Sequence, residues 1–232
     1  GGDVPLIYRF GTAVNSDVMK GYAADKQRET PVKPTTNWLD MFRGLETLRF
    51  LPALQQETAT YQAPSATWYP ETEFCYFSNK QGLFMAAKGG YNNESHNHND
   101  AGTVSVYSHH VPMLIDAGVG TYTRQTFSSE RYSIWTMQSN YHNLPLINGV
   151  PQKFGSEYKA TEVKVDSRKQ TFSANIATAY PEEAAAEKWI RSYRLGKDRL
   201  TITDTFRLKE AKAANVVNFL VWGNVDLSVP GI

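Results

Sequence analysis

From about residue 65 onward, apolar and polar residues alternate in short runs, the pattern of β-strands with one buried and one wet face. The runs are rich in Val, Ile, Thr, Tyr and Phe and are separated by the turn-forming residues Gly, Pro, Asn and Asp. The expected strands are Ala66–Tyr69, Glu73–Ser78, Leu83–Lys88, Thr103–Tyr107, Met113–Ile115, Thr161–Val165, Thr171–Ile176, Trp189–Leu195, Arg199–Phe206 and Val216–Val221. So many short strands predict a large antiparallel β-sandwich. Only residues 181–188, with Glu182, Glu183 and three Ala, are compatible with a short surface helix.

Before residue 65 the apolar residues follow a helical period instead. Ser16 can cap a helix that begins at Asp17, whose carboxylate favours the positive end of the helix dipole. Asn37 can cap a second helix, in which apolar residues recur every three or four positions. These residues are Trp38, Met41, Phe42, Leu45, Leu48 and Leu51 or Leu54. The intervening segment 27–36, with its prolines, is expected to be a loop.

The two patterns together predict an α+β chain that is mostly β. Residues 1–60 are expected to form the end of a helical domain and a linker, because two helices cannot make a domain alone. Residues 61–232 are expected to form the β-sandwich. The chain has no initial Met and stops just after a strand-like stretch. We therefore expect a piece of a longer protein whose helical domain is missing and whose sandwich is truncated.

Composition limits the classes of partner. The 232 residues include 24 Lys+Arg and 23 Asp+Glu, a net charge of +1. This balance argues against a nucleic-acid-binding polycation, and any polyanion would have to bind a local basic cluster. No apolar run approaches the roughly 20 residues that span a bilayer, so no membrane span is expected. Cys75 is the only cysteine, which excludes an internal disulfide but leaves the cellular compartment open.

The first segment whose side chains could catalyse a reaction or bind a metal is Glu94-Ser95-His96-Asn97-His98-Asn99-Asp100-Ala101-Gly102. In an extended segment, His96, His98 and Asp100 would project from one face. Asp100 precedes a glycine by two residues, where Asp is more often a turn former, and it is left out of the ligand set.

Two further motifs complete a candidate metal site. Asp116 ends an apolar strand and precedes Ala117-Gly118-Val119-Gly120, and His142 lies in Tyr141-His142-Asn143. With His98, these side chains would supply two imidazoles and one carboxylate from three separate strands. That set suits zinc and leaves one coordination position for water. The alternative is that each His is a hydrogen-bonded surface or core residue, the reading we adopt for His109 and His110 in their turn.

These three motifs, with Ile147-Asn148-Gly149 downstream, resemble those of the heparinase II/III-like polysaccharide lyases. The resemblance covers about residues 60–225, and residues 1–55 look like the last helices of the family's α/α toroid. It implies a β-sandwich that forms a substrate groove together with the helical domain. It also implies a zinc-containing lyase of acidic polysaccharides that is periplasmic or secreted by a bacterium.

The resemblance assigns roles position by position. His98, Asp116 and His142 correspond to metal ligands, and His96 corresponds to a groove residue beside the substrate. Tyr132 lies in the loop where some members place an active-site tyrosine. The alternative for Tyr132 is a packed aromatic, and Tyr132-Ser133-Ile134-Trp135 could stack on sugars or belong to the core.

The implied reaction is β-elimination from a uronate-containing polysaccharide. A base removes the proton alpha to the carboxylate, an acid protonates the leaving oxygen, and cationic or amide donors stabilise the developing charge. On chemical grounds, Arg124 or Arg131 would suit the carboxylate.

Several alternatives stay open at this stage. Heparin or heparan sulfate-like and alginate-like substrates both fit, and the metal could be structural or could polarise the substrate. The competing functions are a non-catalytic carbohydrate-binding or scaffold sandwich with a structural zinc, and a zinc hydrolase. The chain alone is expected to be nearly inactive, because half of the groove would be missing.

Overall fold

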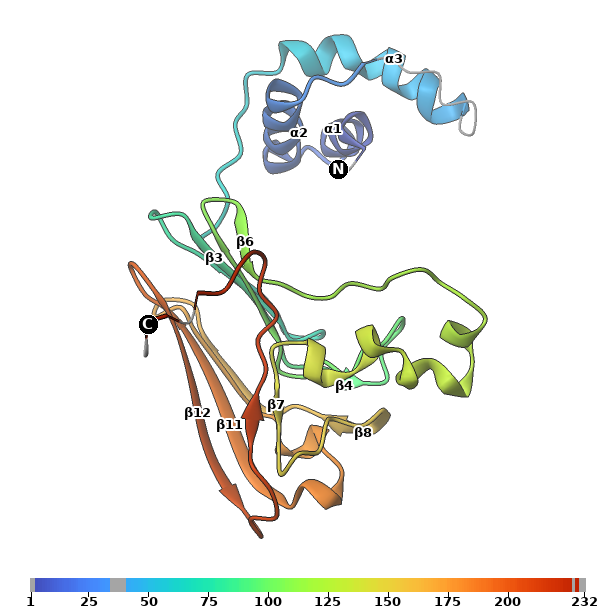
Figure 1. Cartoon of the computed structure of the whole chain (residues 1–232). Coiled ribbons are helices and arrows are strands. Elements are labelled where there is room, and N and C mark those ends of the chain that lie inside the picture. The colour runs from blue at the N-terminus through green and yellow to red at the C-terminus, as the bar shows by residue number, and fades with distance from the viewer. Residues whose placement is uncertain (1–2, 34–40, 227, 230–232) are drawn as a thin grey trace. The chain divides into compact units, whose positions relative to one another are not determined.

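In a computed structural model, residues 3–33, 41–226 and 228–229 are described. The chain divides into two compact units, Gly1–Ala63 and Pro64–Ile232 (Figure 1). The division lies three residues after the expected boundary between residues 60 and 61. None of the helices in the described part of the chain combines the length and apolar character needed to cross a membrane.

Within its described residues, the first unit contains three helices, α1 (Val4–Ala13), α2 (Asp17–Glu29) and α3 (Met41–Gln56). The predicted cap of α2 is confirmed, since Ser16 Oγ accepts a hydrogen bond from the Met19 amide at 3.3 Å. Helix α1 was not predicted, although Asp3 caps it and a proline stands in its first turn.

The apolar stripe of α3 is buried only at its C-terminal end. Leu51 and Leu54 pack with Tyr8 of α1 and the small residues Ala23 and Ala24 of α2. The stripe residues before them are more than half exposed, namely Met41, Phe42, Leu45 and Leu48. The predicted cap Asn37 and the first stripe residue, Trp38, lie outside the described residues.

The second unit is built from antiparallel strands, which confirms the predicted sandwich class. One sheet has the order β1-β2-β3-β5-β6 and the other β12-β11-β10-β9, with two short pairs, β13-β7 and β4-β8. The strands are β1 (Ala66–Tyr69), β2 (Phe74–Ser78), β3 (Leu83–Lys88), β4 (Tyr91–Asn92), β5 (Val104–Ser108), β6 (Val111–Leu114), β7 (Pro145–Leu146), β8 (Gly155–Lys159), β9 (Thr161–Asp166), β10 (Thr171–Asn175), β11 (Ala186–Leu195), β12 (Leu200–Leu208) and β13 (Val216–Val217).

All ten predicted strands are present, although the last shortens to Val216–Val217, and β4, β7 and β8 were not predicted. The short helix expected over 181–188 is reduced to the 3-10 turn Glu182–Ala184. Ala185 then adopts a left-handed conformation with φ 48°, and β11 begins at Ala186. The reversal at Ala185 stops helix growth and directs the chain into the sheet.

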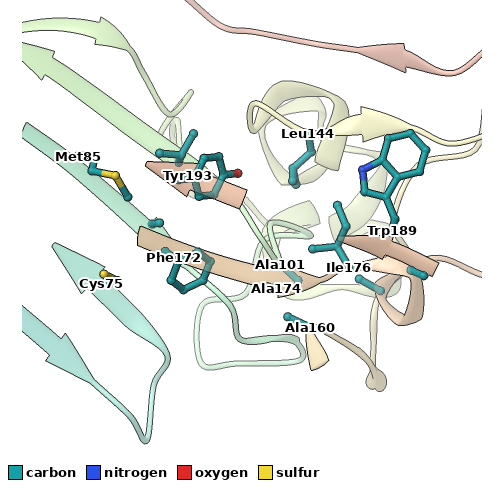
Figure 2. Close-up of a cluster of buried hydrophobic side chains, with 14 of the residues drawn as sticks. Cys75, Met85, Ala101, Leu144, Ala160, Phe172, Ala174, Ile176, Trp189 and Tyr193 are labelled. Carbon is teal, nitrogen blue, oxygen red and sulfur yellow. The ribbon is translucent and has the colours of Figure 1, made fainter. Parts of the chain in front are cut away.

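The main core lies where alternate residues of the two large sheets meet. Phe172 of β10 contacts Trp68 of β1 at 6.4 Å between ring centroids and Tyr193 of β11 at 6.0 Å. Figure 2 shows Phe172 and Tyr193 with Met85 and Trp189 in one cluster of buried apolar side chains. Cys75 is buried in the same core, and burial raises the pKa of its thiol to about 12, so this sulfur remains a protonated packing group.

A long connection between β6 and β7 contains four 3-10 turns, η1 (Gln125–Phe127), η2 (Ser129–Ser133), η3 (Trp135–Met137) and η4 (Ser139–Tyr141). It appears as the yellow-green segment of short turns in Figure 1. This connection and the loop after β4 carry most of the chemically distinctive residues.

The core assignment predicts a strong contrast between two phenylalanines. Phe172→Ala should lower the free energy of unfolding of the sandwich by about 3–5 kcal/mol, because it leaves a cavity at a fully buried site. Phe127→Ala, at a side chain that is 76% exposed, should change it by less than about 0.5 kcal/mol. Urea unfolding followed by tryptophan fluorescence measures both, and equal losses would contradict the assigned core.

Candidate metal centre

Three polar side chains from distant parts of the chain converge beside the sandwich. They are His98 from the loop after β4, Asp116 just after β6, and His142 just after η4. One potential ligand atom from each lies within 4.8 Å of the other two. The sequence motifs named the same three residues. Contrary to expectation, they come from loops and strand ends rather than from three strands.

The hydrogen bonds of His142 define which of its ring nitrogens can bind a cation. Its Nε2 lies 2.9 Å from the Thr136 carbonyl oxygen, which can only accept, so Nε2 carries a proton. Nδ1 lies 2.6 Å from Asp116 Oδ2. A carboxylate oxygen and an unprotonated imidazole nitrogen are both acceptors. Two such atoms repel one another at this distance, so the contact requires either a proton on Nδ1 or a metal ion bound by both residues.

Electrostatics in the cluster follow from this pairing. Burial lowers the pKa of His142, but the hydrogen bond and charge of Asp116 outweigh it and raise the pKa overall. Burial raises the pKa of Asp116, yet the bond to His142 brings it below its usual value. The pKa of His98 is lowered by burial and by the neighbouring His142. His98 is thus held as a neutral imidazole, the form that binds metals.

The donor set fits zinc. Two imidazoles and one carboxylate match a three-ligand site with an open fourth position, and the rings of His98 and His142 lie 5.1 Å apart between centroids. Within the described residues, no hydrogen bond occupies either ring nitrogen of His98. The Thr136 carbonyl fixes the His142 tautomer, and the Gly118 amide donates to Asp116 Oδ1 at 2.7 Å. Such outer partners are typical of metal ligands.

Asn143 determines where His142 lies. Its side-chain amide donates to the carbonyls of Val104 and Ile115 at 2.8 and 2.9 Å, and its Oδ1 accepts from the Leu220 amide at 2.7 Å. Its φ is 57°, in the left-handed region that Asn tolerates better than most residues. Because Ile115 precedes Asp116, this single side chain fixes two ligands relative to one another.

The His98 loop is anchored at both ends by one buried cation. Lys88 Nζ lies 2.7 Å from Asp100 Oδ1 and 2.8 Å from Glu94 Oε2, and the residue is only 5% exposed. Burial lowers the pKa of Lys88, but the two carboxylates outweigh it and raise the pKa overall. Asp100 is therefore engaged by Lys88, in agreement with its omission from the ligand set.

The segment between these anchors is a turn and not a strand. His96 has a φ of 57°, and this left-handed residue breaks the alternation that would place His96, His98 and Asp100 on one face. The shared face expected for an extended segment is therefore wrong. His98 turns inward to the cluster, whereas His96 is exposed.

A second anchor of this loop was not predicted. Gln152, only 4% exposed, donates from Nε2 to the Ala101 carbonyl at 2.7 Å and accepts from the Ala101 amide at 3.1 Å. It also accepts from Asn92 Nδ2 at 3.0 Å. Neither Gln152 nor Lys88 stands in a sequence pattern that distinguishes it from a surface residue. A buried role for them becomes visible only in three dimensions.

His96 lies at the surface beside two aromatic residues. Its Nδ1 is 3.3 Å from the Tyr122 hydroxyl, and the two rings meet edge to face. Tyr122 in turn stacks on Phe127, whose ring is largely exposed. His96 is thus outside the cluster of three, as the sequence reading had it, and is accessible to a ligand in solution.

Tyr132 and the two candidate arginines occupy different environments. The Tyr132 ring stacks on Phe154 at 4.5 Å, and its hydroxyl accepts from Asn97 Nδ2 at 3.2 Å. Arg131 donates to the backbone carbonyls of Asn97 and Thr126, so its guanidinium holds the loop together. Arg124 is exposed, with no side-chain partner among the described residues.

Trp135, at the end of the aromatic stretch, is half exposed. It is 53% accessible and contacts Tyr141 edge to face at 5.0 Å. It therefore lies outside the sandwich core, which was one of the two locations expected for the stretch Tyr132-Ser133-Ile134-Trp135.

Comparisons with known proteins agree with this architecture. A family model described as heparinase II/III-like, C-terminal, matches residues 62–229. No curated protein matches the chain in sequence.

Solved structures of larger proteins share the fold. A crystal structure of a heparan sulfate lyase HepC mutant from Pedobacter heparinus is 18% identical, with a TM-score of 0.51, over 69% of this chain and 26% of that one. The heparinase III BT4657 gene product with methylated lysines is 18% identical, with a TM-score of 0.51, over 80% of this chain and 27% of that one. At this identity the likeness shows the fold alone. The chain spans about a quarter of the length of these structures.

The cluster predicts about one tightly held zinc ion per chain, because its donor set matches a three-ligand zinc site. Elemental analysis of purified protein should find this zinc. His98→Ala should reduce it to the level of chelator-treated protein, whereas the control His110→Ala, in an exposed turn, should retain it. Wild-type protein without zinc, or His98→Ala with full zinc, would contradict the site.

The Lys88 anchor predicts a large loss of stability. Lys88→Met should lower the free energy of unfolding by about 3–5 kcal/mol, because it leaves two partly buried carboxylates without their cation. Neutralising the partners as well, in Lys88→Met/Glu94→Gln/Asp100→Asn, should recover most of the loss. Urea unfolding measures both variants, and a single variant as stable as wild type would refute the anchor.

Proposed function

Because the chain belongs to the heparinase II/III-like family, we propose that it supplies the β-sandwich side of a groove in which a uronate-containing acidic polysaccharide is cut by β-elimination. The observation that carries the proposal is the division between His98 and His96. Two residues apart, one is buried in a cluster suited to zinc and the other is exposed beside Tyr122. This arrangement can fix a reactive imidazole at a surface without using it as a ligand.

Within this proposal, His98, Asp116 and His142 hold a zinc ion. When bound, the ion supplies a fixed positive charge that ties the His98 loop to the end of β6 and to the residue after η4. The proposed role is mainly structural, because the three candidate ligands come from three separate segments of the chain that one ion would join. A metal that tightens this loop would also narrow the range of positions open to His96.

The proposed proton transfers belong to His96 and Tyr132. His96, exposed and hydrogen-bonded through Nδ1 to Tyr122, can exchange a proton with the substrate through Nε2. Tyr132 offers a hydroxyl that already accepts from Asn97 Nδ2 and can still donate. Arg124, the candidate arginine without a partner in the described residues, suits the uronate carboxylate. Arg131 instead holds the loop through its hydrogen bonds to the Asn97 and Thr126 carbonyls.

The substrate class stays broad within the proposal. Heparin or heparan sulfate-like and alginate-like chains both carry the uronate that β-elimination requires. The net charge of +1 gives no general attraction for a heavily sulfated chain. We also propose a periplasmic or secreted bacterial enzyme whose helical domain supplies the other side of the groove.

The alternative function is a carbohydrate-binding or scaffold sandwich in which zinc only joins loops. The burial of two of the three candidate ligands, His98 and His142, is compatible with it. What favours catalysis is His96, an exposed imidazole that lies two residues from a candidate ligand and is hydrogen-bonded through Nδ1 to Tyr122.

The test uses the complete gene product that contains this chain, with heparan sulfate and alginate as substrates. Elimination creates unsaturated uronate ends that absorb ultraviolet light. His96→Ala should lower kcat by about 100-fold or more, the contribution of a general acid or base, while the control His109→Ala should not. Saturated new ends would indicate hydrolysis, and binding without new ends would indicate the scaffold. The isolated 232 residues should show little turnover.

A further inference from the structure

A charged pair occupies core-facing positions in the four-stranded sheet. Along β11, Trp189, Arg191, Tyr193 and Leu195 alternate toward the interior, and Arg191 is only 1% exposed. Asp204 stands directly opposite it on β12. The Arg191 Nη2 atom lies 3.2 Å from Asp204 Oδ2, and Asp204 Oδ1 accepts from Trp189 Nε1 at 2.8 Å. Figure 2 shows Trp189 and Tyr193, the neighbours of Arg191 on the same face, within the apolar core.

The sheet itself does not need this pair. A buried ion pair contributes little to stability compared with apolar residues of similar size, and the neighbouring core-facing positions on β11 are apolar or aromatic. The guanidinium is also incompletely satisfied, since Nε and Nη2 make no hydrogen bond among the described residues. The one hydrogen bond that Arg191 does make leads out of the sheet.

That bond connects the sheet to the candidate metal centre. Arg191 Nη1 donates to the carbonyl oxygen of Asn143 at 2.7 Å. Asn143 is 1% exposed and follows His142 directly. Its side chain also holds Ile115, the residue before Asp116. A shorter apolar residue at position 191 would leave this carbonyl buried without a donor, which disfavours the present position of the loop.

We propose that Arg191, neutralised by Asp204, is a positioning residue that holds Asn143 and, through it, the ligand geometry of His142 and Asp116. The metal part of this inference rests on the proposed zinc site, but the positioning of Asn143 does not. The pair acts from the strand β11 on Asn143, which lies 48 residues earlier in the chain. A side chain of the four-stranded sheet would thus help to position the residues of the candidate metal centre.

The test replaces both charges together. Arg191→Met/Asp204→Asn removes the donor to Asn143 while leaving an acceptor for Trp189. Amide hydrogen exchange at Leu220, which donates to Asn143 Oδ1, should become about tenfold faster, the effect of one ordinary hydrogen bond. Exchange in the β2–β3 ladder should be unchanged. Zinc affinity, measured by competition with a chelating indicator, should fall by about 10–100-fold.

A matched control separates positioning from general destabilisation. Phe77→Leu changes a buried core residue of β2 and should lower thermal stability without changing Leu220 exchange or zinc affinity. If the double variant keeps both wild-type values, the proposal is overturned. If the wild-type protein binds no zinc, the proposed metal site fails, and Leu220 exchange alone decides the role of Arg191.

A conservative variant keeps the test decisive if the double variant does not fold. Arg191→Lys retains the charge opposite Asp204 but loses the fork that reaches two acceptors at once. Leu220 exchange should then lie between the wild-type and unprotected rates. A value equal to that of the wild-type protein would overturn the proposal.

Discussion

The arrangement of the site depends on the hydrogen bond from His142 Nε2 to the Thr136 carbonyl. A backbone carbonyl cannot donate, so it sets the tautomer and directs the Nδ1 lone pair at Asp116. Two acceptors 2.6 Å apart require a cation between or beside them. A proton on Nδ1 agrees with the raised pKa of His142, whereas the lowered pKa of His98 keeps the His98 ring neutral and available to a metal ion. One fixed tautomer thus decides what the whole cluster can bind.

None of the three candidate ligands is held by a strand ladder, so their precision must come from side chains. Asn143 joins three backbone segments, Lys88 closes the His98 loop, and Gln152 binds both polar groups of the Ala101 backbone. Each of these groups is buried, and a buried polar group is costly when unpaired. The loops are therefore restricted to positions that satisfy all of these bonds together.

The fold was largely predictable because an antiparallel sheet repeats every two residues, and the ten expected strands follow that period. Strands of two residues such as β4 and β7 have no period to detect. The three candidate ligands were predicted because they lie in recognisable motifs. The geometry of their loop was wrong, because nothing in the local sequence shows that His96 adopts a left-handed turn. Lys88, Gln152 and Arg191 were missed because their partners are distant in sequence. An arginine among alternating core positions of β11 was nevertheless a usable signal.

The left-handed turn at His96 links the structural and the chemical parts of the site. In an extended segment His96 and His98 would point the same way, and both would enter the cluster or both would leave it. The turn reverses one of them, so that a single pentapeptide presents an inward ligand and an outward imidazole. The Lys88 anchor, at Glu94 and Asp100, brackets this turn on both sides. The ion pairs of Lys88 with Glu94 and Asp100 thereby stabilise the left-handed conformation of His96. An unfavourable backbone conformation persists in a folded protein when surrounding contacts hold it in this way.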